Sequence, residues 1–85
     1  MRLSLLALTL LTSPTLALAG PTCSGDAPKL PMWQIAQSYE QSGHTIKLMK
    51  VTKGGCYEIY GYENGDKVEI YFDPRSGSVL EKHKD

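Results

Sequence analysis

Residues 54–77 read GGCYEIYGYENGDKVEIYFDPRSG, and this stretch decides the fold. Asn64-Gly65 is a strong hairpin signal, because a two-residue turn requires positive φ and both residues tolerate it. The turn fixes which residues lie opposite one another: Tyr62 and Lys67, Gly61 and Val68, Tyr60 and Glu69, Ile59 and Ile70, Glu58 and Tyr71, Tyr57 and Phe72. One face of the hairpin is apolar and the other carries tyrosines and glutamates, so a slip of one residue would mix the two sets.

The apolar face of this hairpin needs a cover, and the preceding segment supplies a helix. Apolar residues recur there with the spacing of one helical face: Met32, Ile35, Ala36 and Tyr39. Pro31 suits the first helical position, and Gly43 suits the C-terminal stop. Trp33 lies off this stripe and is predicted to pack at the margin between helix and sheet, with an exposed anchor for a partner as the alternative.

Residues 45–52 (TIKLMKVT) are predicted to form the first strand. Ile46 and Leu48 alternate with polar residues, but Val51 falls out of phase with them. This slip indicates either a bulge near Met49-Lys50 or partial cover of both faces of the strand.

The chain after the hairpin is predicted to turn and return. Residues 73–77 (DPRSG) have turn chemistry, and residues 78–81 can form a short last strand. Residues 82–85 are charged and are expected to fray. The predicted fold class is therefore α+β, with one N-terminal helix packed on a three- to four-stranded antiparallel β-meander.

The first 19 residues have the pattern of a secretory signal peptide. Arg2 supplies the positive start, residues 3–11 a short apolar run, and residues 17–19 (ALA) a small-x-small cleavage site. The alternative is a buried N-terminal helix or a retained anchor. Cleavage would leave an irregular N-terminal arm, residues 20–29, followed by one domain, residues 30–85. We expect a periplasmic or secreted protein without membrane attachment after cleavage.

The two cysteines of the chain, Cys23 and Cys56, allow only one intramolecular disulfide. An exported chain meets an oxidising compartment, and a domain of this size often needs a covalent link. A Cys23–Cys56 bond is therefore predicted, with two free thiols or a metal-binding pair as the alternatives. Removal of Arg2 with the leader leaves eight basic and nine acidic residues, a balance that does not favour nucleic acid as a partner.

Four features of the sequence resemble the PepSY domain family, especially its small exported single-domain members. They are Trp33 in the predicted helix, GHTIKLMKV (43–51), CYEIYGYENGDKVEIYFD (56–73) and DPRSG (73–77). The resemblance covers residues 30–80. Ser76 replaces the usual threonine, and the usual helix after the sheet is missing or reduced to residues 80–85.

This resemblance implies a helix-on-sheet fold in the periplasm or outside the cell. PepSY units also occur in propeptides of thermolysin-like metalloproteases, which implies a protease-restraining or protein-binding role. The resemblance supplies no catalytic residues.

The polar face of the hairpin is the candidate binding surface. Its predicted binding residues are Glu58, Tyr60, Tyr62, Glu69 and Tyr71. Tyrosine is enriched in interfaces because it offers a large contact area at low entropy cost. The alternatives are cross-strand pairing that only stabilises the sheet, and contact through an exposed strand edge.

The sequence predicts no catalytic centre, cofactor or metal. His44 and His83 are expected to be solvated, and Glu58 and Glu69 are diagonal neighbours on an open sheet without a pocket to shift their pKa values. The acidic residues offer oxygen ligands, but hairpin turns are acidic for ordinary reasons. The predicted function is a protein-binding module whose partner is a secreted metalloprotease, with a periplasmic ligand- or metal-sensing domain as the alternative.

Overall fold

The computed structural model describes residues 20–23 and 27–85. The predicted signal peptide, residues 1–19, lies outside the described residues, as do residues 24–26 of the arm. The described arm residues belong to neither helix nor strand. Within these described ranges, no helix has both the length and the apolar character needed to cross a bilayer.

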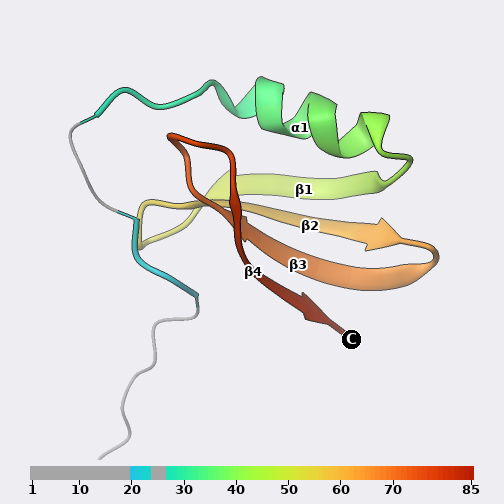
Figure 1. The fold of residues 1–85 in the computed structure, drawn as a ribbon. Helices are drawn as coiled ribbons and strands as arrows, with labels where there is room; N and C mark the ends of the chain where they lie inside the picture. Colours follow the sequence, from blue (N-terminus) through green and yellow to red (C-terminus); the bar gives the residue numbers. More distant parts are fainter. Residues whose placement is uncertain (1–19, 24–26) are drawn as a thin grey trace, which may run out of the picture.

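One helix and four strands build the fold, in the order α1 (Met32–Gln41), β1 (Thr45–Val51), β2 (Tyr57–Glu63), β3 (Asp66–Phe72) and β4 (Val79–Lys84). Neighbouring strands are antiparallel, and the sheet order follows the chain, β1-β2-β3-β4. The helix lies along the β1 side of the sheet, with β4 at the opposite edge (Figure 1). The predicted α+β fold is confirmed, with four strands.

The β2–β3 hairpin has the predicted register at every position, from Tyr57 opposite Phe72 to Tyr62 opposite Lys67. Asn64 has φ of 54° and Gly65 has φ of 85°, the left-handed conformations that a two-residue hairpin turn requires. The local turn chemistry therefore sets the alternation of side chains over both strands.

The core lies between α1 and one face of the sheet, which we call the inner face. Its buried residues are Ile35, Tyr39, Tyr57, Ile59, Val68, Ile70 and Phe72, with Met32, Ile46 and Met49 packed against them. Gly61 allows close approach here, because a Cβ would collide with the Thr45 carbonyl oxygen and lie 3.2 Å from the Tyr39 ring. The opposite side of the sheet is called the outer face.

The helix follows the predicted stripe but differs at two positions. Pro31 is the N-cap residue with extended backbone and not the first helical residue. Gly43 ends the helix as predicted, with φ of 89° and its N–H donating to the Glu40 carbonyl at 2.9 Å. The expected packing of Trp33 at the helix–sheet margin is wrong, because 64% of this residue is exposed.

The irregularity of β1 lies earlier than predicted. Ile46 pairs with Gly61 and Leu48 with Tyr60, so the extra residue is Lys47 and not one near Met49-Lys50. The bulge moves Leu48 to the outer face and brings Met49 to the core. A single extra residue is enough to exchange the faces of all residues that follow it.

The C-terminal residues are held by the sheet, so the expected fraying of residues 82–85 is wrong: β4 includes residues 82–84, and the Asp85 N–H donates to the Lys67 carbonyl at 3.1 Å. β4 runs to Lys84, and Lys82 pairs with Ile70. The register shifts where Phe72 pairs with Val79 but Tyr71 pairs with Glu81. Lys82 thereby reaches the inner face, where it meets an acidic side chain described below.

Candidate functional site

The outer face carries all five residues predicted to bind, because they alternate with the core residues of β2 and β3. Glu58 pairs with Tyr71, Tyr60 with Glu69, and Tyr62 with Lys67. The edge strands extend these rows. Lys50 and Leu48 of β1 lie opposite Glu58 and Tyr60, while Glu81 and His83 of β4 lie opposite Tyr71 and Glu69.

The exposure of this face differs between its two halves, so the sheet is not open over all of the predicted binding residues. Tyr71 is only 4% exposed and Glu58 only 2%, whereas Tyr60, Tyr62 and Glu69 are half-buried. The N-terminal arm causes the difference, since Gly20 lies against the ring of Tyr71. We therefore distinguish a covered half, with Glu58 and Tyr71, from an open half, with Tyr60, Tyr62 and Glu69.

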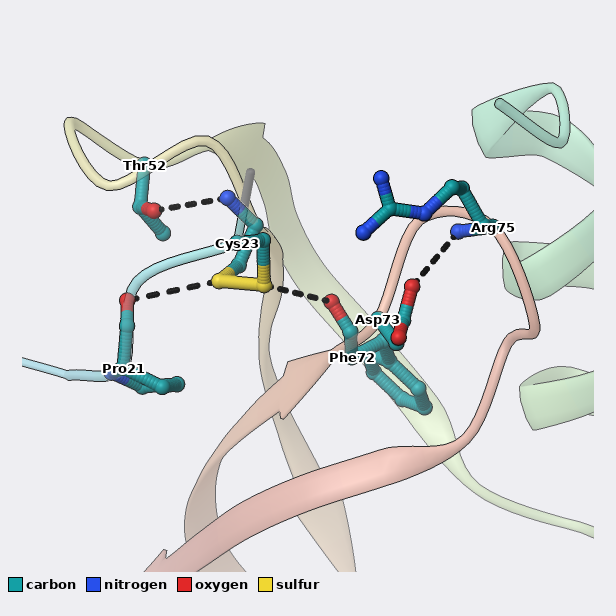
Figure 2. The surroundings of a disulfide bond; sticks show 7 residues. Pro21, Cys23, Thr52, Phe72, Asp73 and Arg75 are labelled. Atoms are coloured by element: carbon teal, nitrogen blue, oxygen red, sulfur yellow. Dashed lines mark hydrogen bonds between the residues drawn. A yellow bond between two sulfur atoms is a disulfide. The ribbon is translucent and has the colours of Figure 1, made fainter. Parts of the chain in front are cut away.

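The arm is attached by the predicted disulfide between Cys23 and Cys56 (Figure 2). The Cys23 N–H also donates to the Gly54 carbonyl at 2.7 Å. Gly54 and Gly55 allow the backbone of the arm to pass close to the turn before β2. A Cβ at Gly54 would lie 2.6 Å from the Pro21 carbonyl oxygen, and one at Gly55, where φ is 86°, would lie 2.5 Å from that of Cys23. The Gly54-Gly55 turn is therefore the docking point of the arm.

Glu58 is a buried carboxylate with incomplete partners. Its Oε1 lies 3.9 Å from Lys50 Nζ, and its Oε2 is buried without a hydrogen bond to any described residue. It borders an outer-face hollow of about 410 Å³, which is also lined by Pro21, Tyr60 and Tyr71. Removal from solvent, and then the charge of Glu58, raise the pKa of Tyr71 to about 12. For Tyr60 the charge of Glu58 is the main reason for a raised pKa.

The open half combines aromatic and apolar surface with charges at its border. Tyr60 and Tyr62 line a shallow depression of about 230 Å³ together with Lys47, Lys67 and Glu69. Leu48, beside Tyr60, is 50% exposed. Lys50 Nζ lies 5.5 Å from the centre of the Tyr60 ring, a cation–π distance that orients this ring.

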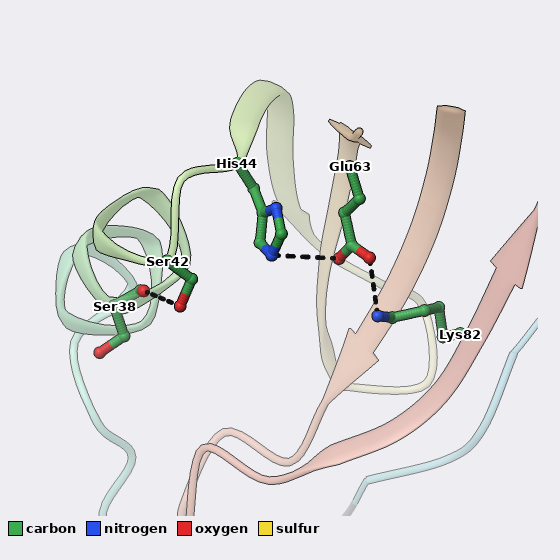
Figure 3. Close-up of polar contacts among 5 residues, drawn as sticks. All are labelled: Ser38, Ser42, His44, Glu63 and Lys82. Atoms are coloured by element: carbon green, nitrogen blue, oxygen red, sulfur yellow. Dashed lines mark hydrogen bonds and ion pairs between the residues drawn. The ribbon is translucent and has the colours of Figure 1, made fainter. Parts of the chain in front are cut away.

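A second polar cluster, on the inner face, was not predicted from the sequence. Lys82 Nζ donates to Glu63 Oε1 at 2.8 Å, and His44 Nε2 lies 4.0 Å from Glu63 Oε2 (Figure 3). The hydrogen bond from Lys82 holds the pKa of Glu63 below its ordinary value, despite burial. Burial and then the nearby Glu63 charge raise the pKa of Tyr39 to about 12. The strand period of two puts Glu63 on the same face as Ile59 and Gly61, which is a signal that could have found it, whereas Lys82 lies in the charged run that was expected to fray.

The comparison with known families decides the identity of this fold. The PepSY family model described as "Peptidase propeptide and YPEB domain" matches residues 2–83 of the 85-residue chain. The chain belongs to the PepSY family. No curated protein matches it, and no solved structure does. The family match starts inside the predicted signal peptide, whose cleavage stays a prediction.

The two histidines of this PepSY domain lie on different faces of the sheet. His44 packs 4.9 Å from the Tyr39 ring on the inner face, while His83 Nε2 contacts Glu81 Oε1 at 2.9 Å on β4. Ser42 donates its hydroxyl to the Ser38 carbonyl at 3.2 Å. In the described part of the chain, no three His, Cys, Asp or Glu side chains gather as metal ligands would.

Replacing Glu63 by glutamine is expected to change how the stability of the PepSY domain depends on pH. The pKa of Glu63 is lower in the folded protein than the ordinary value of about 4.3 in an unfolded chain. Its stabilisation is therefore present above that pH and is lost as the pH falls through the folded pKa. At neutral pH we expect Glu63→Gln to lower the free energy of unfolding by roughly 1–2 kcal/mol, since Lys82 is partly solvated.

Denaturant titrations of both proteins between pH 7 and pH 3 measure this difference. Glu40→Gln is the matched control, because Glu40 is an exposed glutamate of the helix. A Glu63→Gln effect that stays constant down to pH 3 would contradict the assigned ion pair.

Proposed function

We propose that this PepSY protein is an exported module that binds another protein through the open half of its outer face, and that it is not an enzyme. The observation that carries the proposal is the pair of half-buried tyrosines, Tyr60 and Tyr62, beside the exposed Leu48 on a part of the sheet that neither helix nor arm covers. Central aromatic side chains with an apolar neighbour and a polar border are typical of binding hot spots.

The arrangement of this surface favours binding over chemistry. Tyr60 stands on the hairpin whose opposite side is the hydrophobic core, so its backbone is held rigidly. A rigid tyrosine loses little entropy when a partner covers it. Lys47, Lys67 and Glu69 at the border of the depression can select a partner by charge.

The proposed partner is a secreted metalloprotease, which the module restrains. The support is the family description, which names peptidase propeptides, together with the disulfide and the predicted leader. The disulfide and the predicted leader both fit the periplasm or the exterior of the cell, where disulfides persist.

Inhibition of a thermolysin-like protease by the purified, disulfide-intact protein tests this proposal. We expect Tyr60→Ala to keep the fold and to weaken binding by about 30-fold, since a central interface aromatic contributes ~2 kcal/mol. Trp33→Ala is the control, because Trp33 is an exposed aromatic residue of the helix and lies outside the outer face. Loss of binding in the Trp33 variant alone would assign the interface to the helix side. Absence of inhibition by the wild-type protein would remove the protease from the proposal.

Ligand sensing is the second candidate function, and one observation favours it. A groove of about 370 Å³ runs between α1 and β4, with Ile35, Phe72 and Val79 as apolar walls and the Glu63–Lys82 pair among its lining residues. Amide chemical-shift changes confined to this groove, on addition of small apolar acids or amines, would support it. If the amide chemical shifts of the groove residues did not change, ligand sensing would be excluded and protein binding would remain the proposed function.

A further inference from the structure

The covered half of the outer face contains a buried carboxylate that needs a further polar partner. Glu58 is 2% exposed, and its Oε2 has no hydrogen bond to any residue that the structure describes. A buried charge without a full set of partners is strongly unfavourable. Lys50 does not meet this need, since its ammonium lies 3.9 Å from the other oxygen and is half-exposed.

The arm brings the backbone of Gly20 to the residue that lies opposite this glutamate on the neighbouring strand. A Cβ at Gly20 would lie 2.5 Å from Cε2 of Tyr71, so the Gly20 backbone rests directly on that ring. Tyr71 is the cross-strand partner of Glu58. The next arm residue, Pro21, lines the same hollow as Glu58 and Tyr71. Gly20 therefore lies against one lining residue of the hollow, Tyr71, and directly precedes another, Pro21.

Gly20 is the predicted first residue of the processed chain, because the predicted signal peptide ends at Ala19. Cleavage there converts the neutral amide nitrogen of Gly20 into a free α-ammonium group. We propose that the hollow is a binding site for a primary ammonium, and that its occupant is the α-ammonium of Gly20 in the processed chain, held by the Glu58 carboxylate and the face of the Tyr71 ring.

The chemistry of the hollow fits this occupant. A carboxylate flanked by aromatic rings binds an ammonium group by charge and by cation–π attraction. The other charged groups that border the hollow are Lys50, Lys53 and Glu69. His83 of β4 also faces the Tyr71 ring, with ring centres 6.2 Å apart. Glycine is required at position 20, since its φ is 95° and any side chain would strike the Tyr71 ring.

The proposal gives the arm two attachments, the disulfide at Cys23 and an ion pair at its first residue. The second attachment does not exist before processing, because the Gly20 nitrogen is then part of a peptide bond. Cleavage of the leader thus completes the cover of Tyr71 and Glu58. This inference concerns the covered half and does not depend on the proposed partner of the open half.

The experiment uses the processed protein purified after export, whose first residue is identified by mass spectrometry. The pKa of its α-amino group is measured by NMR titration, and its melting temperature is compared with that of the same protein after selective N-terminal acetylation. We expect Gly20 as the first residue and an α-amino pKa above the ordinary value of about 8. Acetylation should lower the melting temperature by about 4 °C or more.

Two variants separate the Glu58 contact from a general effect of acetylation. In Glu58→Gln, acetylation is expected to leave the melting temperature nearly unchanged. In Glu69→Gln, which removes another glutamate of the same face, the full loss on acetylation should remain. A processed chain that starts elsewhere, an α-amino pKa at or below its ordinary value, or equal acetylation effects in wild type and Glu58→Gln would each overturn the proposal. If Glu58→Gln does not fold, the NMR titration of the α-amino group in the wild-type protein still tests the proposal.

Discussion

Ile70→Ala is expected to lower the free energy of unfolding by roughly 2–5 kcal/mol, which for so small a domain approaches its whole stability. Ile70 is 1% exposed and lies opposite Ile59, which is fully buried. Removal of its side chain leaves a cavity in the middle of the sheet that the surrounding strands cannot fill without losing their pairing. Urea denaturation followed by circular dichroism measures the loss.

Leu48→Ala is the matched control for this substitution. Leu48 is also an aliphatic strand residue, but it is 50% exposed on the outer face. Its replacement should change stability by less than about 1 kcal/mol, since it leaves no enclosed cavity. If the two variants were equally destabilised, the assignment of inner and outer faces would be wrong.

Removal of the disulfide should have an effect of similar size. The bond joins residues 33 positions apart, and the chain-entropy model gives about 3–4 kcal/mol for such a loop. The Cys23→Ala/Cys56→Ala protein is therefore expected to unfold at a much lower denaturant concentration than the oxidised wild type. The reduced wild-type protein is the control that keeps both side chains in place.

The same change should uncover the outer face. Because the arm contributes to the burial of Tyr71, loss of the disulfide should let the pKa of this tyrosine fall from about 12 toward its ordinary value near 10. An ultraviolet titration of tyrosinate measures the shift. A reduced protein with an unchanged Tyr71 pKa would mean that the arm stays docked by its backbone contacts alone.

The sequence predicted the hairpin completely and the edges of the sheet incompletely, for a physical reason. Asn64-Gly65 specifies a turn by local backbone preference, and the turn then determines every pair from Tyr57–Phe72 to Tyr62–Lys67. The last strand pairs with β3, and its Lys82 also forms an ion pair with the distant residue Glu63. A run of charged residues read locally looks like a frayed tail, and only the folded sheet shows which lysine faces an acid.

The candidate site was likewise predicted in part. The strand period of two placed Glu58, Tyr60, Glu69 and Tyr71 on one face, and the two-cysteine count predicted the Cys23–Cys56 link. Neither pattern says over which side chains the arm passes after the link forms. The signal was present in Gly54-Gly55, since two adjacent glycines leave room for a second backbone, but a glycine pair equally suits an ordinary turn.

The meander has a consequence for the order in which the chain folds. Each strand pairs with its neighbour along the chain, so most of the sheet forms from contacts that are short in sequence, and such topologies fold quickly. The link from Cys23 to Cys56 spans a longer separation and depends on an oxidation step that takes seconds or more. We therefore expect the sheet to form first, with Cys56 accessible at the start of β2, and the arm to close last. Once the disulfide is reduced, we expect the arm to detach first, and Tyr71 beneath it to be the first buried side chain that meets solvent.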